Sequence, residues 1–370
     1  MSTHAIVTGG GTSGHVLPAL AIAEALVAVG HERSEIHYVG TRRGVETSLV
    51  PPTGFPHTLL DVVGVQRSLS RRNLSVPWRL WRSVRAARGL LQRLQPSVVV
   101  NVGGYASFPA TWAARRAGVP YVIVSYDRRP GLVSRLLAGG AAACAVAFEG
   151  SSLPHAVHTG APVRADLVHL DRGVRRAAAR RELGLPEDRF VIAVVGGSLG
   201  AAALNTVVAG LVERWSDRSD LAIYHVVGPR NLAAAAPSRD GASGILYLVT
   251  GYEERMADLY AAADVLVTRA GAGTVAELAT VGAPAILVPW PEAAENHQLD
   301  NARVLSDVGA AILLEQQQLT VDRLVDEIDR LRLDRRTLSA LADAARAAGA
   351  VHRSGELVRL IDRVAAGARR

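Results

Sequence analysis

The sequence predicts an α/β protein of two domains, each built on a parallel β-sheet. Three observations support this fold class. Short β-branched apolar runs alternate with longer helical stretches, which is the pattern of βαβ units. Glycine-rich turns follow several of these runs and stand directly before a helix. The chain has 370 residues, which exceeds one typical hydrophobic core, so two domains are expected.

The composition indicates a globular chain that binds an anionic partner. Hydrophobic residues make up 49% and charged residues 20% of the sequence, which is not a disordered composition. Basic residues, all of them arginine, outnumber acidic ones by 41 to 34, for a net charge of +7. This balance suggests nucleic acid, anionic lipid or a phosphorylated substrate as the partner.

Two further features of the sequence indicate the cellular compartment of the protein. Cys144 stands alone, which excludes an internal disulfide and fits a reducing compartment. No signal-peptide pattern is expected at the N-terminus, and no apolar run reaches the roughly 18 to 20 residues that span a bilayer. We therefore expect a soluble or peripheral protein.

In the first half, the predicted strands end in glycine-rich or polar loops. In parallel sheets such loops lie at one edge, so they predict the wall of a ligand cleft. The strands are 4–8, followed by the glycine loop 9–15 and a helix over 17–29; 36–39, followed by a charged loop; 97–102, followed by Gly103-Gly104-Tyr105; and 120–125, followed by the polar loop 126–131.

His15 stands where the first glycine loop meets its helix. A helix N-terminus disfavours the imidazolium form, so the ring should stay neutral and able to accept a proton. The alternative is a surface histidine that only caps or packs locally, which is the commoner case for a single histidine.

The segment 68–95 predicts an amphipathic helix. Leu80, Trp81, Val84 and further aliphatic residues share one half of the helical wheel, while arginines and Trp78 fill the other half. Packing on the sheet explains the apolar half. The tryptophan among arginines fits a membrane-surface role better than a plain solvated face, which stays the alternative.

The second half repeats the α/β pattern. We place the interdomain linker in the charged segment 160–180, which reads as irregular. The domains are then 1–165, 166–350 and a C-terminal helix 351–370 that is expected to cross back to the first domain. Predicted strands of the second domain are 190–195, 221–227, 245–249, 264–268 and 284–289, and amphipathic helices occupy 324–370.

The stretch 264–301 contains a βαβ unit with a ligand-binding turn. Its glycines let a ligand approach the backbone, and the helix that begins near Thr274, which could cap it, offers unpaired N–H groups to a phosphate. Glu277 could accept hydrogen bonds from a ribose diol. The turn 196–201 could cradle a diphosphate in the same way. The alternative is that these glycine turns are ordinary connections between a strand and a helix and bind no ligand.

Several enzyme classes are excluded by missing motifs. The sequence has no GxSxG elbow, no metal-ligand spacing of cysteine and histidine, and no DxD pair at a strand end. A metal-free enzyme must neutralise a leaving diphosphate with helix ends, backbone N–H groups and arginine. Group transfer from a nucleotide donor, without metal or cofactor, fits this inventory.

Seven motifs then carry a specific resemblance over nearly the whole chain. They are GGTSGHVLPALAIAEAL at 10–26, GGYASFPA at 103–110, PGLVSRLLA at 130–138, GAPVR at 160–164, GGSLGAAALN at 196–205, RAGAGTVAEL at 269–278 and ENHQLDNAR at 295–303. Together they resemble the MurG family, whose members move GlcNAc from UDP-GlcNAc to lipid I in peptidoglycan synthesis. The resemblance implies the GT-B fold, two Rossmann-like domains facing each other across a cleft. It also implies inversion at the anomeric carbon, no metal or cofactor, and a peripheral place on the cytoplasmic membrane face.

The resemblance also assigns site residues. His15 and Asp127 are the candidate bases, and the acceptor side would hold Thr12, Ser13, Gly14, Gly104, Tyr105 and Tyr126. The donor side would hold Arg164, Gly196, Gly197, Ser198, Tyr252, Glu253 through its backbone, Ala272, Gly273, Thr274, Glu277, Gln298 and Asn301. The implied partners are UDP-GlcNAc, a lipid-linked or other glycosyl acceptor and an anionic membrane, without nucleic acid.

The sequence departs from the family pattern mainly on the acceptor side. Val124-Ser125-Tyr126-Asp127 replaces a histidine–glutamate–x–asparagine run, and Ser134 replaces an asparagine. Ser13, Leu199 and Gly273 replace a glycine, a glutamine and a large residue. Two alternatives therefore stay open beside ordinary transfer to lipid I: a paralogue with another acceptor, and a UDP-sugar-binding protein without turnover.

Overall fold

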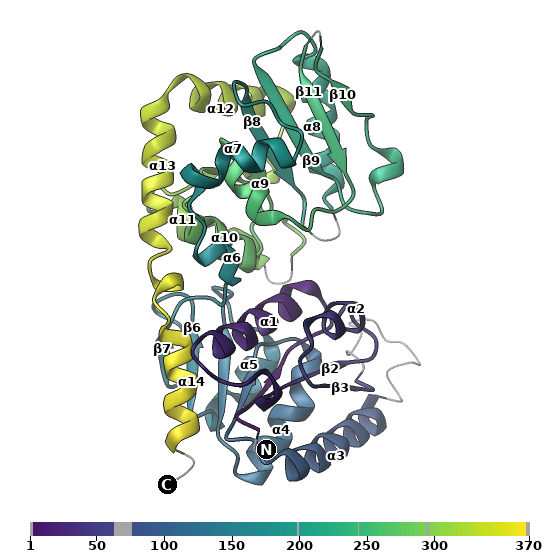
Figure 1. Ribbon diagram of the computed structural model, residues 1–370, viewed down its shortest axis with the longest axis vertical. Helices are drawn as coiled ribbons and strands as arrows, with labels where there is room; N and C mark the ends of the chain where they lie inside the picture. Colours follow the sequence, from purple (N-terminus) through teal and green to yellow (C-terminus); the bar gives the residue numbers. More distant parts are fainter. Residues whose placement is uncertain (1–2, 63–75, 198–199, 243, 294–295, 368–370) are drawn as a thin grey trace. The chain divides into compact units, whose positions relative to one another are not determined.

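The computed structural model describes residues 3–62, 76–197, 200–242, 244–293 and 296–367 (Figure 1). The chain divides into two compact units. Unit 1 contains Met1–Ala165 together with Val351–Arg370, and unit 2 contains Asp166–Ala350. The last segment of the chain therefore belongs to the same unit as the first.

Unit 1 is built on a seven-stranded sheet in which every pair of neighbouring strands is parallel, in the order β3-β2-β1-β4-β5-β6-β7. Its central strands are fully buried, as expected where helices cover both faces of a parallel sheet. The strands are β1 (Ala5–Thr8), β2 (Ile36–Thr41), β3 (His57–Leu60), β4 (Val98–Asn101), β5 (Tyr121–Ser125), β6 (Ala143–Val146) and β7 (Ala156–His158).

Helices from both ends of the chain pack on this sheet. The helix α14 contacts β4, β5, β6 and α1, and Figure 1 shows it in yellow beside β6 and β7. Its buried residues follow the helical period. The helices of unit 1 are α1 (Ser13–Ala28), α2 (Glu46–Leu49), α3 (Val76–Leu94), α4 (Phe108–Ala117), α5 (Leu132–Leu137) and α14 (Glu356–Gly367).

The structure corrects one prediction for α3. Trp81 was expected on the buried half of the helix, but 52% of its surface is exposed. The buried stripe instead runs through Ser83, Ala87 and Leu90, at the spacing of one helix face. Trp81 lies two residues before Ser83, on the opposite side, where it stacks on the exposed Trp78 with ring centroids 5.0 Å apart.

Unit 2 is built on a second seven-stranded sheet, in the order β10-β11-β9-β8-β12-β13-β14. All pairs are parallel except β10 with β11. The strands are β8 (Phe190–Val195), β9 (Leu221–Val226), β10 (Arg239–Asp240), β11 (Leu246–Thr250), β12 (Val265–Thr268), β13 (Ala285–Leu287) and β14 (Ile312–Leu313).

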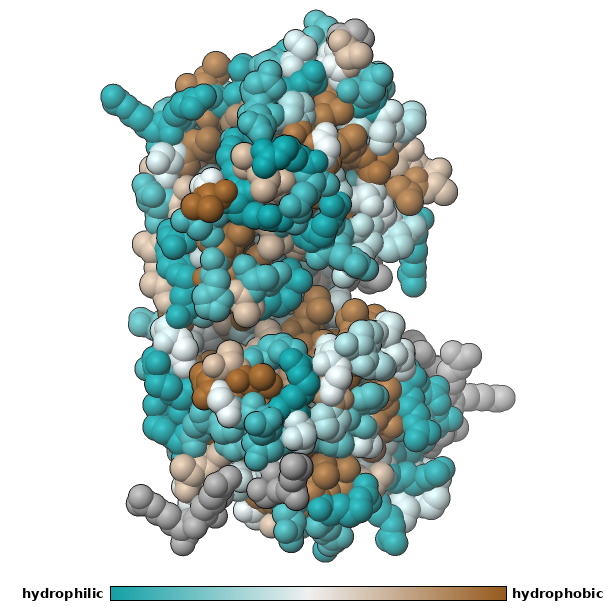
Figure 2. Space-filling view, in the orientation of Figure 1, coloured by the Kyte–Doolittle hydropathy of each residue, from teal (hydrophilic) through white to brown (hydrophobic). Residues whose placement is uncertain are grey.

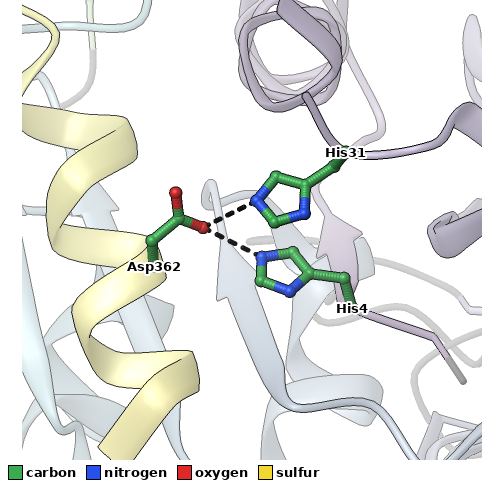
Figure 3. A group of neighbouring side chains, drawn as sticks. All are labelled: His4, His31 and Asp362. Atoms are coloured by element: carbon green, nitrogen blue, oxygen red, sulfur yellow. Dashed lines mark hydrogen bonds and ion pairs between the residues drawn. The ribbon is translucent and has the colours of Figure 1, made fainter. Parts of the chain in front are cut away.

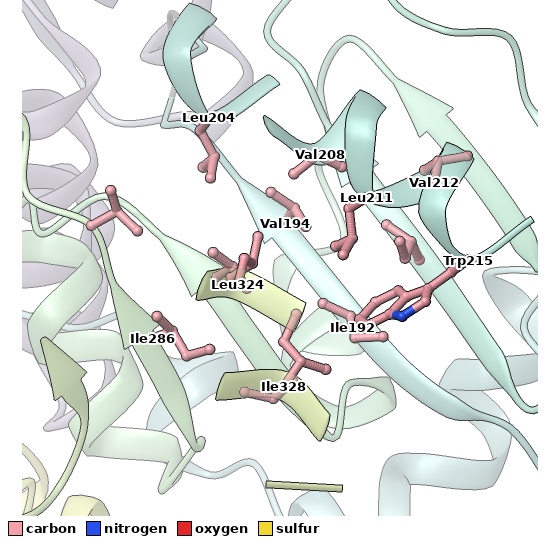
Figure 4. Close-up of a cluster of buried hydrophobic side chains, with 14 of the residues drawn as sticks. Ile192, Val194, Leu204, Val208, Leu211, Val212, Trp215, Ile286, Leu324 and Ile328 are labelled. Atoms are coloured by element: carbon pink, nitrogen blue, oxygen red, sulfur yellow. The ribbon is translucent and has the colours of Figure 1, made fainter. Parts of the chain in front are cut away.

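A hydrophobic core stabilises this sheet. Figure 4 shows Ile192 and Val194 of β8 and Ile286 of β13 packed beneath Leu204 and Leu324, which come from two different helices. The helices of unit 2 are α6 (Ala165–Val168, which starts in unit 1), α7 (Arg172–Glu182), α8 (Ala202–Arg214), α9 (Met256–Ala262), α10 (Ala272–Val281), α11 (His297–Ser306), α12 (Val321–Leu333) and α13 (Arg335–Ala348).

Part of the predicted linker is a regular helix. The segment 160–180 was expected to be irregular, but α7 fills its second half and belongs to unit 2. Its arginines have specific partners. Arg172 donates to the carbonyls of Tyr260, Ala263 and Gly282, and the fully buried Arg180 pairs with Asp264. Burial lowers the pKa of Arg172 to about 10. The arginines of this segment therefore anchor α7 to the rest of unit 2 and do not mark a solvated linker.

Each sheet has a point where the strand order reverses, and glycine loops flank it. In unit 1 the reversal lies between β1 and β4, and in unit 2 between β8 and β12. In open α/β sheets, ligands bind at the carboxyl ends of the strands at such points. The loops that begin at Gly9, Gly103, Gly196 and Gly271 are thus in the positions where a ligand is expected.

The surface carries both hydrophobic and hydrophilic residues. On the face drawn in Figure 2, hydrophobic residues form small groups among hydrophilic ones. No helix in the described part of the chain combines the length and the apolar character that a bilayer crossing requires.

Candidate active site

The first glycine loop and His15 form the centre of the site in unit 1. The helix α1 begins at Ser13, four residues earlier than predicted, so His15 lies in its first turn. Thr12 Oγ1 lies 3.2 Å from His15 Nδ1. A Cβ built on Gly103, where φ is +90°, would lie 3.0 Å from the imidazole Cδ2. The ring is therefore packed against a backbone that only glycine allows to come so close.

A second contact fixes the same turn. Pro18 lies inside α1 and has no N–H, so the carbonyl of Gly14 has no donor four residues later. The hydroxyl of Tyr126, a buried residue at the end of β5, donates to this carbonyl instead. The rings of Tyr126 and His15 are 6.5 Å apart between centroids. The loops after β1, β4 and β5 thus meet around His15.

The environment of His15 keeps its imidazole neutral. Burial lowers the pKa of His15 and outweighs the carboxylates of Asp127 and Glu46, which raise it. A neutral ring is the form that accepts a proton. If Nδ1–H donates to Thr12 Oγ1, the lone pair is on Nε2.

Glu46 was not assigned to the site by sequence reasoning, although it holds the first loop. Its carboxylate is fully buried and accepts hydrogen bonds from the backbone N–H groups of Gly11 and Thr41. A Cβ on Gly10 would lie 2.2 Å from Glu46 Oε1, and one on Gly44 2.0 Å from Oε2. The sequence offered one sign of this role: Glu46 follows a predicted strand in the same charged loop as Arg42 and Arg43.

The other acceptor-side residues surround this loop. Tyr105 lies beneath it, because a Cβ on Gly11 would be 2.5 Å from Tyr105 Cε1. Gly104 approaches the carbonyl of Gly10 so closely that a Cβ there would be 2.3 Å away. Asp127 is partly buried directly after Tyr126. The replaced positions Val124, Ser125 and Ser134 are buried in this structure.

In unit 2, the turn after β8 has the backbone of an anion-binding loop. Gly197 and Gly200 have φ values of +85° and +78°, which favour glycine. A Cβ on Gly200 would lie 2.1 Å from the carbonyl oxygen of Val227. The helix α8 then begins at Ala202. The predicted residues Gly196 and Gly197 belong to this turn, whereas Ser198 and Leu199 lie outside the described residues.

The turn after β12 leads directly into α10. This helix begins at Ala272 with Gly271 at the N-cap, so Thr274 lies in the first turn and does not cap it, contrary to prediction. Ala272 and Gly273 also lie in that turn, where backbone N–H groups are unpaired. Glu277 follows one turn later, and Tyr260 Oη donates to its Oε2 at 2.8 Å. The carboxylate is partly exposed and held in place by this bond.

The end of β11 places the predicted base-binding pair. The side chain of Tyr252 is 49% exposed. That of Glu253 is buried and accepts bonds from Tyr224 and from the backbone N–H of Arg255. Burial alone would raise the pKa of Glu253, but these bonds hold it below the ordinary value. With its carboxylate engaged, Glu253 offers a ligand its backbone.

The remaining predicted residues are more scattered. Gln298 Oε1 accepts from the N–H of Trp290 at 3.0 Å. Asn301 is fully buried, and its amide donates to Ala270 in the turn before α10 at 3.4 Å. Arg269, also missed by sequence reasoning, is buried and donates to Val288. Arg164 is partly buried and belongs to unit 1.

A cavity of about 840 Å³ lies elsewhere in unit 2. Arg172, Asp264 and Pro284 line it, at the amino ends of the strands and away from the glycine loops. Ligand sites of open α/β sheets lie at the opposite edge, so we do not assign the active site to this cavity.

Comparison with known proteins gives a consistent family. The models of the glycosyltransferase family 28 N-terminal and C-terminal domains match residues 5–146 and 191–355. The UDP-N-acetylglucosamine--N-acetylmuramyl-(pentapeptide) pyrophosphoryl-undecaprenol N-acetylglucosamine transferase of Desulforudis audaxviator is 36% identical, over 97% of this chain and 98% of the relative. The Acidothermus cellulolyticus protein of the same name is 38% identical over 99% of both chains.

Solved structures support the same family. The crystal structure of Acinetobacter baumannii MurG matches with a TM-score of 0.73 and 28% identity, covering 97% of this chain and all of that one. The glycosyltransferase of kitacinnamycin matches with a TM-score of 0.64 and 19% identity, over 97% of this chain and 99% of that one. The second likeness concerns the fold alone.

Proposed function

The chain belongs to glycosyltransferase family 28, and on that premise we propose how it transfers GlcNAc from UDP-GlcNAc to lipid I. It is a UDP-sugar-dependent glycosyltransferase of the GT-B fold, and its function is the MurG step of peptidoglycan synthesis that makes lipid II. The residues that carry the reaction, its stereochemistry and its place at a membrane are our proposals.

His15 is the general base. Its Nε2 takes the proton of the acceptor hydroxyl while the hydroxyl oxygen attacks C1 of GlcNAc. The bond from C1 to the diphosphate oxygen breaks with inversion, and UDP leaves. The observation that carries this proposal is the position of the His15 imidazole, 3.2 Å from Thr12 Oγ1 and packed against Gly103, where the loops after β1, β4 and β5 meet. Burial, which lowers its pKa, favours the neutral form. A carboxylate is in general a weaker base than a neutral imidazole, so His15 is proposed as the base and Asp127 is proposed to orient the acceptor.

The donor is proposed to bind unit 2 through its two glycine turns. The backbone N–H groups at the starts of α8 and α10 stabilise the diphosphate as negative charge develops on it. Glu277, oriented by Tyr260, accepts hydrogen bonds from the ribose hydroxyls. Tyr252 and the backbone of Glu253 contact the uracil. Gln298 contacts the sugar, and the buried Asn301 supports the turn to which it donates.

One assay separates this proposal from its rivals. The purified protein is incubated with labelled UDP-GlcNAc and lipid I, and the label is followed into lipid II. Transfer to lipid I supports the proposal. UDP-GlcNAc binding without transfer would support the non-catalytic alternative, and transfer to another acceptor only would support the diverged paralogue.

We further propose that α3 binds an anionic membrane surface. Trp78 and Trp81 are exposed and stacked, and the guanidinium of Arg85 lies 5.8 Å from the Trp81 ring. Tryptophan partitions to the membrane interface, and arginine is attracted to anionic headgroups. The acceptor of this reaction is lipid-linked, so a membrane-facing helix on unit 1 would bring the enzyme to it.

A further inference from the structure

A second cluster of side chains lies in unit 1, among residues to which the proposed reaction assigns no role. Figure 3 shows His4 and His31 side by side, with their Nε2 atoms directed at Asp362 of α14. Each Nε2 lies 3.0 Å from the same oxygen, Asp362 Oδ1. The two rings are stacked with centroids 3.7 Å apart. We propose that these three residues bind one divalent transition-metal ion, with zinc as the best fit.

The spacing of the ligand atoms fits such an ion. In a tetrahedral zinc site with bonds of about 2.0–2.1 Å, two ligand atoms are about 3.4 Å apart. The Nε2–Oδ1 distances of 3.0 Å are within a few tenths of an ångström of this value. All three ligand atoms lie within 4.8 Å of one another. To admit the ion, the Asp362 carboxylate would shift outward and the two stacked rings, whose planes differ by 17°, would tilt so that both Nε2 lone pairs point at it.

The chemistry of the donors selects the same class of ion. Imidazole nitrogen with one carboxylate oxygen suits zinc and its neighbours in the first transition row, whereas magnesium and calcium prefer oxygen ligands. Although the chain is rich in arginine, the ion pairs of Asp362 in the described residues are with the two imidazoles. A bound dication would supply the positive charge that no guanidinium of the described residues supplies to this carboxylate.

The site is built on ordered backbone. The N–H of His4 donates to Glu35, and that of His31 donates to Leu26 at the end of α1. The side chains of His4, His31 and Asp362 are 8%, 24% and 37% exposed. One side is thus closed by protein and the other is open to water, which can provide a fourth ligand. The ion would fasten α14 to the start of β1 and the end of α1.

Metal titration of the full chain tests the proposal. The protein is treated with a chelator, exchanged into a non-coordinating buffer near pH 7.5 and titrated with zinc chloride by calorimetry. We expect one equivalent to bind and the midpoint of thermal unfolding to rise with zinc concentration. His31→Ala and Asp362→Asn should each weaken this binding at least about tenfold, since even the loss of an outer-shell partner costs that much.

His57→Ala is the matched control, because His57 is an exposed histidine of β3 in the same unit. It should leave zinc binding unchanged. Circular dichroism verifies that each variant is folded. Absence of zinc binding to the wild-type chain, or equal binding by all three variants, would overturn the proposal. In either case the cluster would be a hydrogen-bonded triad, in which Asp362 accepts from both imidazoles.

Discussion

His15 owes its proposed role to burial and to one hydrogen-bond partner. We expect His15→Ala to lower turnover by about 10²- to 10⁴-fold, the usual range for loss of a general base. UDP affinity should change little, because every predicted donor residue except Arg164 lies on unit 2. Steady-state kinetics and calorimetry with UDP test both expectations. A severe effect of Asp127→Asn together with a nearly silent His15→Ala would place the base in the loop after β5.

The pKa of the same histidine predicts the pH profile. Burial lowers it below its ordinary value near 6.5, and catalysis requires the neutral form. The rate should therefore fall to half its maximum only at a pH below 6.5, where His15 becomes protonated. A rate that already halves near pH 7 would contradict the environment described for His15.

Glu46 is proposed to be a positioning residue, and Glu46→Gln tests it. The amide would place N–H donors where the carboxylate accepts from Gly11 and Thr41. A buried unpaired donor costs about 1–3 kcal/mol, so the midpoint of thermal unfolding and kcat should both decrease, with donor affinity retained. Glu24→Gln is the control, since that carboxylate pairs with Arg33 at a 41% exposed site. Equal effects of the two changes would remove Glu46 from the site.

A substitution of Glu277 tests whether the donor binds at the proposed site on unit 2. Glu277→Ala removes an acceptor that Tyr260 already orients. A hydrogen bond to a charged group contributes about 1.5–3 kcal/mol, so calorimetry should show UDP-GlcNAc binding weakened by about one to two orders of magnitude. Unchanged affinity would mean that this carboxylate only holds Tyr260.

At the scale of secondary structure, α3 gives a prediction about membranes. Replacing Trp78, Arg79 and Arg82 with serine should release the protein from anionic vesicles, because one ring of the stacked tryptophan pair and two nearby charges are lost. Co-sedimentation at two salt concentrations measures this. The matched control replaces the exposed Leu333, Arg335 and Arg336 of unit 2 with serine. If both triple variants bind alike, the attraction is general and α3 is not the contact.

The elements also show what the sequence could and could not predict. Both parallel sheets of the predicted fold class are confirmed, because a β-branched run before a glycine turn is a local signal. The starts of α1 and α10 were placed too late, since their first residues, Ser13-Gly14 and Ala272-Gly273, show no apolar periodicity. The arginines of α7 looked solvated because their partners, such as Asp264, lie far along the chain. Glu46 was overlooked because the loop residue that it holds, Gly11, lies 35 residues earlier in the chain.

At the scale of the whole molecule, one buried and two partly buried histidines should make stability depend on pH. Burial lowers the pKa of His37 and His352 in unit 1, and of His225 in unit 2, to about 4. In the unfolded chain these groups titrate near 6.5, so between the two values the unfolded state binds more protons. Stability is then complete above pH 6.5 and decreases as pH falls toward 4, by about 1.4 kcal/mol per unit for each histidine.

Thermal unfolding between pH 7.5 and 4.5 tests this expectation. His225→Gln should flatten the pH dependence for unit 2, because it removes the group that hydrogen-bonds Tyr247 and Asn205. The same change should leave the pH dependence of unit 1 unaltered. An unfolding midpoint that is independent of pH in this interval would show that these histidines are not buried as described.

The return of α14 to unit 1 has a consequence for biosynthesis. A ribosome that has made β1 to β7 must still make all of unit 2 before it makes the helix that covers β4, β5 and β6. At about 5–20 residues per second, the 185 residues from Asp166 to Ala350 take about 10–40 s. During that time the apolar surface under α14 is open on the nascent chain. Chaperones that hold exposed apolar surface should therefore meet this protein first at unit 1, while unit 2, which is continuous in sequence, can complete its fold without waiting.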